Sequence, residues 1–146
     1  MQSLELDLEF IQQNSMLVTA AVVSGIMFLV FTFYRPGSKA SLSTTQATLL
    51  INREDAVVID VRTPDEYIAG HLPESRNIPL AQLEERAGEL DKLKDTPLLI
   101  VCQTGARSDG ACTKLKKLGF SRTNNLGGGI NAWRDAGLPL KKGNKK

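Results

Sequence analysis

The sequence is poor in cysteine and histidine, with two cysteines and one histidine in 146 residues. Cys102 and Cys112 lie ten positions apart, and together with His71 they form neither a CxxC pair nor a cluster with zinc-ligand spacing. This argues against a metal site and against a scaffold held by disulfides, so we expect no metal and no organic cofactor. Unpaired cysteines favour a reducing compartment.

Positive charge is absent from residues 1–34, and no charge of either sign occurs from Phe10 to Tyr34. The apolar run over residues 16–34 is long enough to cross a bilayer, and a secretory signal peptide would begin with basic residues. We therefore expect a short N-terminal segment over 1–15 and one transmembrane helix over 16–34; a cleaved signal and a buried helix are the alternatives. Because Arg35 follows the run, the positive-inside rule predicts a single-pass membrane protein with its domain on the cytoplasmic side.

The length of 146 residues fits one domain with a short extension. The whole sequence has 42% hydrophobic and 23% charged residues, which are ordinary values for a globular protein. We expect a linker over 35–40, a domain over 41–141 and a basic tail over 142–146. The excess of lysine near the end is typical of a solvated helix face and tail. No nucleic-acid partner is expected, and attraction to anionic membranes or substrates is the weaker interpretation.

Apolar segments alternate with helical patterns along this domain. We predict strands at 57–59, 98–101 and 123–126, a very short strand at 77–78, and helices at 46–52, 65–69, 80–90 and 108–118, with a short helix through Trp133 and Ala136 after three glycines. Ser43 or Thr44 is placed to cap the first of these helices. The alternation predicts an α/β fold with a parallel sheet covered by helices on both faces, and ligands bind such sheets at the carboxyl ends of strands.

The segment after residues 98–101 carries the strongest chemical signal. Cys102 lies at the predicted strand end, in a short loop that opens a helix and that contains Gly105 and Arg107. Such a loop aims several backbone N–H groups at one point, the helix dipole adds positive charge, and both favour a reactive thiolate. We expect Cys102 to be a nucleophile facing an anionic substrate, although an inert buried cysteine and plain loop geometry are the alternatives. The expected substrate-binding residues are Gln103, Thr104, Gly105, Ala106, Arg107 and Ser108, mainly through their N–H groups, and Ser108 is also placed to cap the helix.

The spacing of this loop narrows the chemistry. Four residues separate Cys102 from Arg107, whereas a cysteine phosphatase loop has five, because a tetrahedral phosphate needs a wider ring of amides. The tighter loop suits a persulfide sulfur, and here the chain resembles the rhodanese family of single-domain sulfurtransferases. Residues 60–79 resemble the first signature of that family and residues 127–139 its closing signature, so the resemblance covers about residues 41–140.

The resemblance implies a rhodanese-like sulfurtransferase, here in a membrane-anchored form. Cys102 would take sulfur from a donor such as thiosulfate or a persulfide, hold it as a persulfide, and pass it to cyanide, a thiol or a protein acceptor. The second hypothesis is a membrane-tethered rhodanese fold that acts as a docking or regulatory module with little catalysis. Phosphatase or arsenate-reductase chemistry is disfavoured by the length of the loop.

Four further residues have mainly structural interpretations. Asp60 and Arg62 lie near the active end of the sheet by resemblance, and we favour a structural ion pair there, with Glu66 as a candidate partner of Arg62. The resemblance makes His71 a packing and hydrogen-bonding residue rather than a base. Cys112 is expected to be a small core residue on its helix, with a resolving thiol as the alternative.

Overall fold

The computed structural model describes residues 2–33 and 41–143, which form an N-terminal helical unit and a separate C-terminal unit. The first unit consists of α1 (Gln2–Gln13) and α2 (Ser15–Phe33). Asn14 joins them without breaking the helical pattern, because its N–H donates to the carbonyl of Phe10 at 3.0 Å. Some predicted parts of the chain lie outside the described residues. These are the linker over 35–40, which includes Arg35, the last residue of the predicted transmembrane helix, Tyr34, and the last three residues of the predicted tail.

Within residues 2–33 and 41–143, no helix combines the length and the apolar character that crossing a membrane requires. The transmembrane helix predicted over 16–34 is therefore not supported.

The C-terminal unit is built on a four-stranded parallel sheet in the order β2-β1-β3-β4. The strands are β1 (Val57–Asp60), β2 (Arg76–Asn77), β3 (Leu98–Val101) and β4 (Thr123–Asn125). Central strand β3 pairs with β1 from Leu98 to Val101 and with β4 on its other edge. Both central strands end at the same edge of the sheet, so residues that follow them are brought together there.

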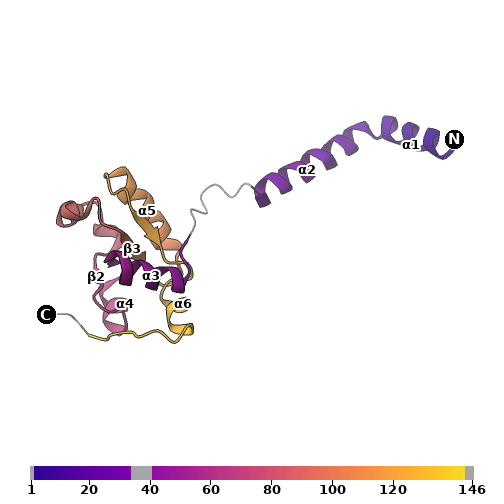
Figure 1. The fold of residues 1–146 in the computed structure, drawn as a ribbon. Helices are drawn as coiled ribbons and strands as arrows, with labels where there is room; N and C mark the ends of the chain where they lie inside the picture. The colour runs from indigo at the N-terminus through magenta and orange to yellow at the C-terminus, as the bar shows by residue number, and fades with distance from the viewer. Residues whose placement is uncertain (1, 34–40, 144–146) are drawn as a thin grey trace. The chain divides into compact units, whose positions relative to one another are not determined.

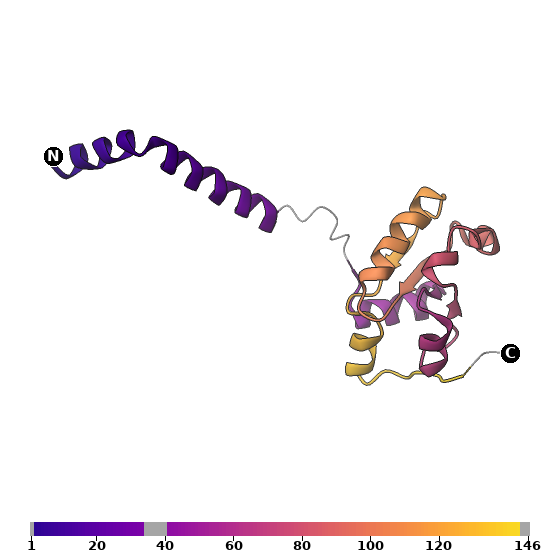
Figure 2. The same ribbon diagram turned by 180° about the vertical axis from the view of Figure 1, so that it is seen from behind.

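Helices cover both faces of this sheet, as predicted (Figures 1 and 2). Side chains alternate along β3: Leu98 and Ile100 join one apolar cluster, and Leu99 and Val101 join the other. The first cluster includes buried residues of α5 (Ala106–Lys117) and of the 3₁₀ helix η2 (Ala87–Leu93), and the second includes residues of α3 (Thr44–Glu54) and α6 (Gly129–Asp135). A strand buried on both faces is continuously apolar, which explains the sequence of β3.

Local signals set the start of two helices. Ser43 caps α3 through a capping box with Gln46, in which each side chain accepts a hydrogen bond from the other residue's backbone N–H. Thr63 and Glu66 form the same arrangement at the start of α4 (Pro64–Ala69). Glu66 also binds Arg107 in the first turn of α5, so this second box fixes the position of that carboxylate.

The helix predicted over 80–90 is wrong in type and extent. The chain there forms the 3₁₀ helix η1 (Leu80–Gln82), turns, and then η2. Leu80 and Leu83, and again Leu90 and Leu93, are three residues apart and pack against the same cluster. A spacing of three places side chains on one face of a 3₁₀ helix, so packing against the sheet overrides the α-helical pattern.

Candidate active site

The loop between β3 and α5 holds the sulfur of Cys102 in a buried cradle. Cys102 is fully buried, and its Sγ accepts a hydrogen bond from the N–H of Gly105 at 3.0 Å. Burial raises the pKa of the Cys102 thiol, but the Ser108 hydroxyl and the backbone amides of Ser108, Thr104 and Gly105 more than offset it, so the pKa lies below its ordinary value. The cradle therefore favours the thiolate, the reactive form of cysteine.

Ser108 has a different position from the predicted helix cap. Helix α5 begins at Ala106, with Gly105 in the left-handed region at φ 96° as its N-cap. The Ser108 side chain lies inside the cradle instead, where its Oγ is 3.3 Å from Cys102 Sγ and 2.5 Å from Asn125 Oδ1. A hydroxyl has one proton, so Ser108 can donate to only one of these two acceptors at a time.

Asn125, at the end of β4, completes this arrangement. Its side-chain amide donates to the carbonyl of Gly105 and to the Ser41 hydroxyl, each at 3.0 Å. The Asn125 side chain therefore holds the loop backbone with its nitrogen and the Ser108 hydroxyl with its oxygen. Because Asn125 Oδ1 can only accept, we expect Ser108 to donate to Asn125 while Cys102 is a neutral thiol, and to turn its hydroxyl toward the sulfur when a thiolate forms.

Arg107 is paired with a carboxylate beside the loop. Its guanidinium donates two hydrogen bonds to Glu66, at 2.9 and 2.8 Å. The hydrogen bond from Arg107 is the main reason that the pKa of Glu66 is lowered to about 2. The pKa of Arg107 is raised, mostly by its bond to Glu66 and also by the negative charge of Cys102, so the cation acts on the site electrostatically.

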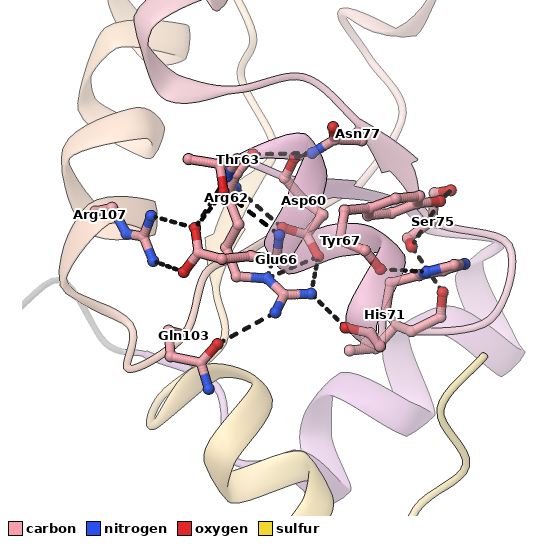
Figure 3. A network of polar contacts seen from close by, with 12 residues as sticks. Asp60, Arg62, Thr63, Glu66, Tyr67, His71, Ser75, Asn77, Gln103 and Arg107 are labelled. Carbon is pink, nitrogen blue, oxygen red and sulfur yellow. Dashed lines mark hydrogen bonds and ion pairs between the residues drawn. The ribbon is translucent and has the colours of Figure 1, made fainter. Parts of the chain in front are cut away.

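A second ion pair, which unlike the first is buried, supports the loop from the segment after β1 (Figure 3). Arg62, 2% exposed, donates to both carboxylate oxygens of Asp60 and to the carbonyl of Gly70. Its remaining Nη1 donates to Gln103 Oε1 at 3.1 Å, and Gln103 Nε2 donates to Asn131 Oδ1 at 2.6 Å. The structural pair predicted for Arg62 is thus present with Asp60, whereas the suggested partner Glu66 binds Arg107.

Close contact with the start of α6 fixes the backbone of Cys102. The N–H of Ile130 donates to the Cys102 carbonyl at 2.9 Å, and the N–H of Asn131 donates to the Gln103 carbonyl at 3.2 Å. Gly129 makes this approach possible, since a Cβ there would lie 2.3 Å from the Cys102 oxygen and the residue has φ +58°. Only glycine fits both the space and the backbone angle.

His71 and Cys112 lie in structural surroundings. The His71 ring stacks on Tyr67 with centroids 3.8 Å apart, and its Nδ1 lies 2.8 Å from the Tyr67 carbonyl. Cys112 is buried on α5, in the same apolar cluster as Cys102. Among the described residues, no group of three or more His, Cys, Asp or Glu side chains is placed to hold a metal.

Residues 43–136 of the sequence match the family model of the rhodanese-like domain. This chain belongs to the rhodanese-like family. Among its relatives, the uncharacterized protein YibN of Escherichia coli strain K12 is 34% identical over 138 residues, which cover 93% of this chain and 96% of YibN. The thiosulfate sulfurtransferase GlpE of Pseudoalteromonas translucida is 36% identical over 95 residues, 65% of this chain and 89% of GlpE.

Solved structures agree with the rhodanese fold. The crystal structure of a rhodanese-related protein from Thermoplasma volcanium superimposes with a TM-score of 0.61 at 33% identity, covering 69% of this chain and 96% of that one. The family and its sulfurtransferase members support a general role in sulfur transfer for this chain.

The rhodanese loop contains the residues predicted from the sequence, but their contributions differ. Thr104 and Gly105 contribute backbone amides, Gln103 uses its side chain to link Arg62 to α6, and the side chain of Ala106 is exposed. Binding of substrate by residues 103–108 stays a prediction.

Sequence reasoning missed Glu66 as the partner of Arg107, and it missed Asn125 and Gly129 altogether. A polar residue at the end of β4 and a run of three glycines before α6 were the available signals.

Proposed function

We propose that this rhodanese domain transfers sulfane sulfur through a persulfide on Cys102. The observation that carries the proposal is the cradle itself, in which backbone amides and the Ser108 hydroxyl converge on a buried sulfur. The Cys102 thiolate attacks the outer sulfur of a donor such as thiosulfate. The new S–S bond takes that sulfur, and sulfite leaves with the electron pair of the broken bond.

The second half-reaction returns the enzyme to its starting state. An acceptor thiolate attacks the outer sulfur of the Cys102 persulfide, and the Cys102 thiolate is the leaving group. Negative charge stays near the loop in every state, so fixed amide dipoles and the Arg107 cation stabilise each of them. The neighbouring Glu66 lowers the net charge of this region, which makes the amides the main source of stabilisation.

Intact-mass spectrometry of the full chain after incubation with thiosulfate tests this proposal. We expect a gain of one sulfur atom that a thiol reductant removes. Cys102→Ser abolishes the gain, whereas Cys112→Ser, which changes the other buried cysteine, retains it. A chain that gains no sulfur while Cys102 remains alkylatable would contradict sulfur transfer and favour the docking module.

The compartment is a separate proposal. Cys102 carries a free and buried thiol, which supports a reducing environment such as the cytoplasm. In-cell labelling of Cys102 with a thiol reagent that crosses membranes, compared with one that does not, tests this. Equal labelling by both reagents in intact cells would contradict it.

A further inference from the structure

Arg107 carries the only fixed charge among residues 102–108 of the active loop. It lies in the first turn of α5, directly before Ser108, whose hydroxyl contacts the Cys102 sulfur. The pKa of Arg107 is raised by its bond to Glu66 and also by the negative charge of Cys102, so the cation and the sulfur interact across the site. Taken alone, this cation would attract small anions toward the sulfur.

Glu66 occupies the hydrogen-bonding fork of this cation (Figure 3). Its two carboxylate oxygens accept from Nη1 and Nη2 of Arg107, at 2.9 and 2.8 Å. Guanidinium groups use the same two-point geometry to hold the oxyanion groups of ligands. An anion that approaches the loop therefore meets a guanidinium that is already paired and whose charge is balanced.

The carboxylate is held in this position by the start of its own helix. Thr63 donates to Glu66 Oε2 with its backbone N–H and with its hydroxyl, each at 3.0 Å. The pKa of Glu66 is lowered to about 2, mainly by the bond from Arg107, so this residue is ionised at neutral pH. The negative charge beside the loop is therefore permanent, and two sets of hydrogen bonds fix its place.

Other charges near the loop are either paired or well exposed to solvent. Arg62 is paired with Asp60, and both side chains are buried. Arg134 and Lys142 line a cavity together with Glu66, but both are exposed, so water and salt screen their charges. The ion pair of Glu66 is half-buried, with side chains only 38% and 34% exposed, so its charges are screened less.

We propose that Glu66 is a specificity-determining residue, which selects against anionic sulfur donors by cancelling the charge of Arg107 beside Cys102. Glu66 takes no part in bond making. A donor with one negative charge is disfavoured less than thiosulfate, which carries two, because the repulsion grows with the charge of the donor. This inference rests on the proposed function, because it concerns which donors reach the same sulfur.

Alkylation of Cys102 in the full chain by iodoacetate and by iodoacetamide tests the inference, with the labelled residue identified by mass spectrometry. The two reagents react with the same thiolate and differ by one negative charge, so the ratio of their rate constants cancels any change in the pKa of Cys102. In Glu66→Gln, the ratio of iodoacetate to iodoacetamide should rise about threefold to tenfold at low salt, because an unbalanced Arg107 attracts the charged reagent. Added potassium chloride should reduce this rise.

Two further variants separate charge from packing. Glu66→Asp keeps the negative charge and should leave the ratio near its wild-type value. Glu89→Gln removes the same charge from another two-point pair, in which Arg86 donates to Glu89 at 2.7 and 3.0 Å on an exposed surface, and should not change the ratio. An unchanged ratio in Glu66→Gln, or an equal rise in either of the other variants, would overturn the assignment.

Loading with thiosulfate extends the test to the proposed reaction. The same potential acts on two charges, so the rate constant for sulfur gain in Glu66→Gln should rise by about the square of the factor found with iodoacetate. If the wild type and the variants all gain no sulfur, the proposed function fails, while the alkylation ratio still decides the role of Glu66. Equal loading rates in the wild type and Glu66→Gln would refute selection against anionic donors even though the persulfide forms.

Discussion

Replacing Ser108 with alanine removes the hydroxyl that lies 3.3 Å from Cys102 Sγ and 2.5 Å from Asn125 Oδ1. The hydroxyl stabilises the thiolate only by turning away from Asn125, so its net effect is the difference between two hydrogen bonds. The alanine variant keeps the backbone amides of the cradle, because these do not depend on the side chain. We therefore expect the pKa of Cys102 to rise toward its ordinary value without loss of the fold.

The magnitude follows from the two bonds. A hydrogen bond to a charged group contributes about 1.5–3 kcal/mol and one between neutral groups about 0.5–1.5 kcal/mol, so the exchange favours the thiolate by about 1 kcal/mol or somewhat more. At neutral pH the alanine variant should then have roughly fivefold to tenfold less thiolate, and its rate of alkylation should fall by the same factor.

The assay is the rate of reaction with iodoacetamide as a function of pH, with the site of labelling identified by mass spectrometry. The midpoint of the Cys102 profile should move to higher pH in Ser108→Ala. Ser121→Ala is the matched control, because its exposed hydroxyl donates to the carbonyl of Lys94, away from the Cys102 loop. An unchanged or lower midpoint in a folded Ser108→Ala protein would show that the hydroxyl does not exchange partners as described.

Three further predictions concern stability. The fold lowers the pKa of Glu66 from 4.5 to about 2, so the ion pair of Glu66 with Arg107 contributes its full stability above pH 4.5. The difference in unfolding free energy between wild type and Glu66→Gln should therefore shrink as the pH falls from 4.5 toward 2. A difference that stays constant over this range in urea titrations would contradict the prediction. Gly129→Ala would place a Cβ 2.3 Å from the Cys102 carbonyl oxygen, and the free energy of unfolding measured in urea should fall by about 1–3 kcal/mol. In the control Gly88→Ala the Cβ would enter open space, so the free energy of unfolding should not change. Equal effects of the two substitutions would refute the packing argument. Asp60→Asn leaves its buried guanidinium partner without a counter-charge and should lower the unfolding free energy by about 3 kcal/mol, so an unchanged urea midpoint would rule out the ion pair as a stabilising contact.

Backbone features near the active loop follow directly from local sequence. The apolar run at 98–101 forms β3, and the position of Cys102 at a strand end before a helix predicted the converging amides that the structure contains. The helix caps at Ser43 and Thr63, and the end of α5 before Gly119, follow from single residues with strong local preferences. Such features are predictable because they depend on a few neighbouring residues.

Side-chain pairing could not be predicted in this way. Arg107 and Glu66 are 41 positions apart, and their pairing depends on where α4 is held against the loop. Ser108 was expected to cap its helix, but the helix begins two residues earlier and turns the hydroxyl toward the sulfur. The helix expected over 80–90 and the membrane-spanning helix over 16–34 were inferred mainly from apolar patterns, and the structure supports neither.

The hydrogen bond from the N–H of Ile130 to the Cys102 carbonyl has a consequence for biosynthesis. A ribosome releases the chain from its N-terminus, so Cys102 emerges well before the residues that hold its backbone. Until Ile130 and Asn131 are available, the carbonyls of Cys102 and Gln103 have no partner from α6. The Cys102 loop of a nascent chain therefore lacks its final geometry, and the sulfur transfer that we propose would start only when nearly the whole domain has been made.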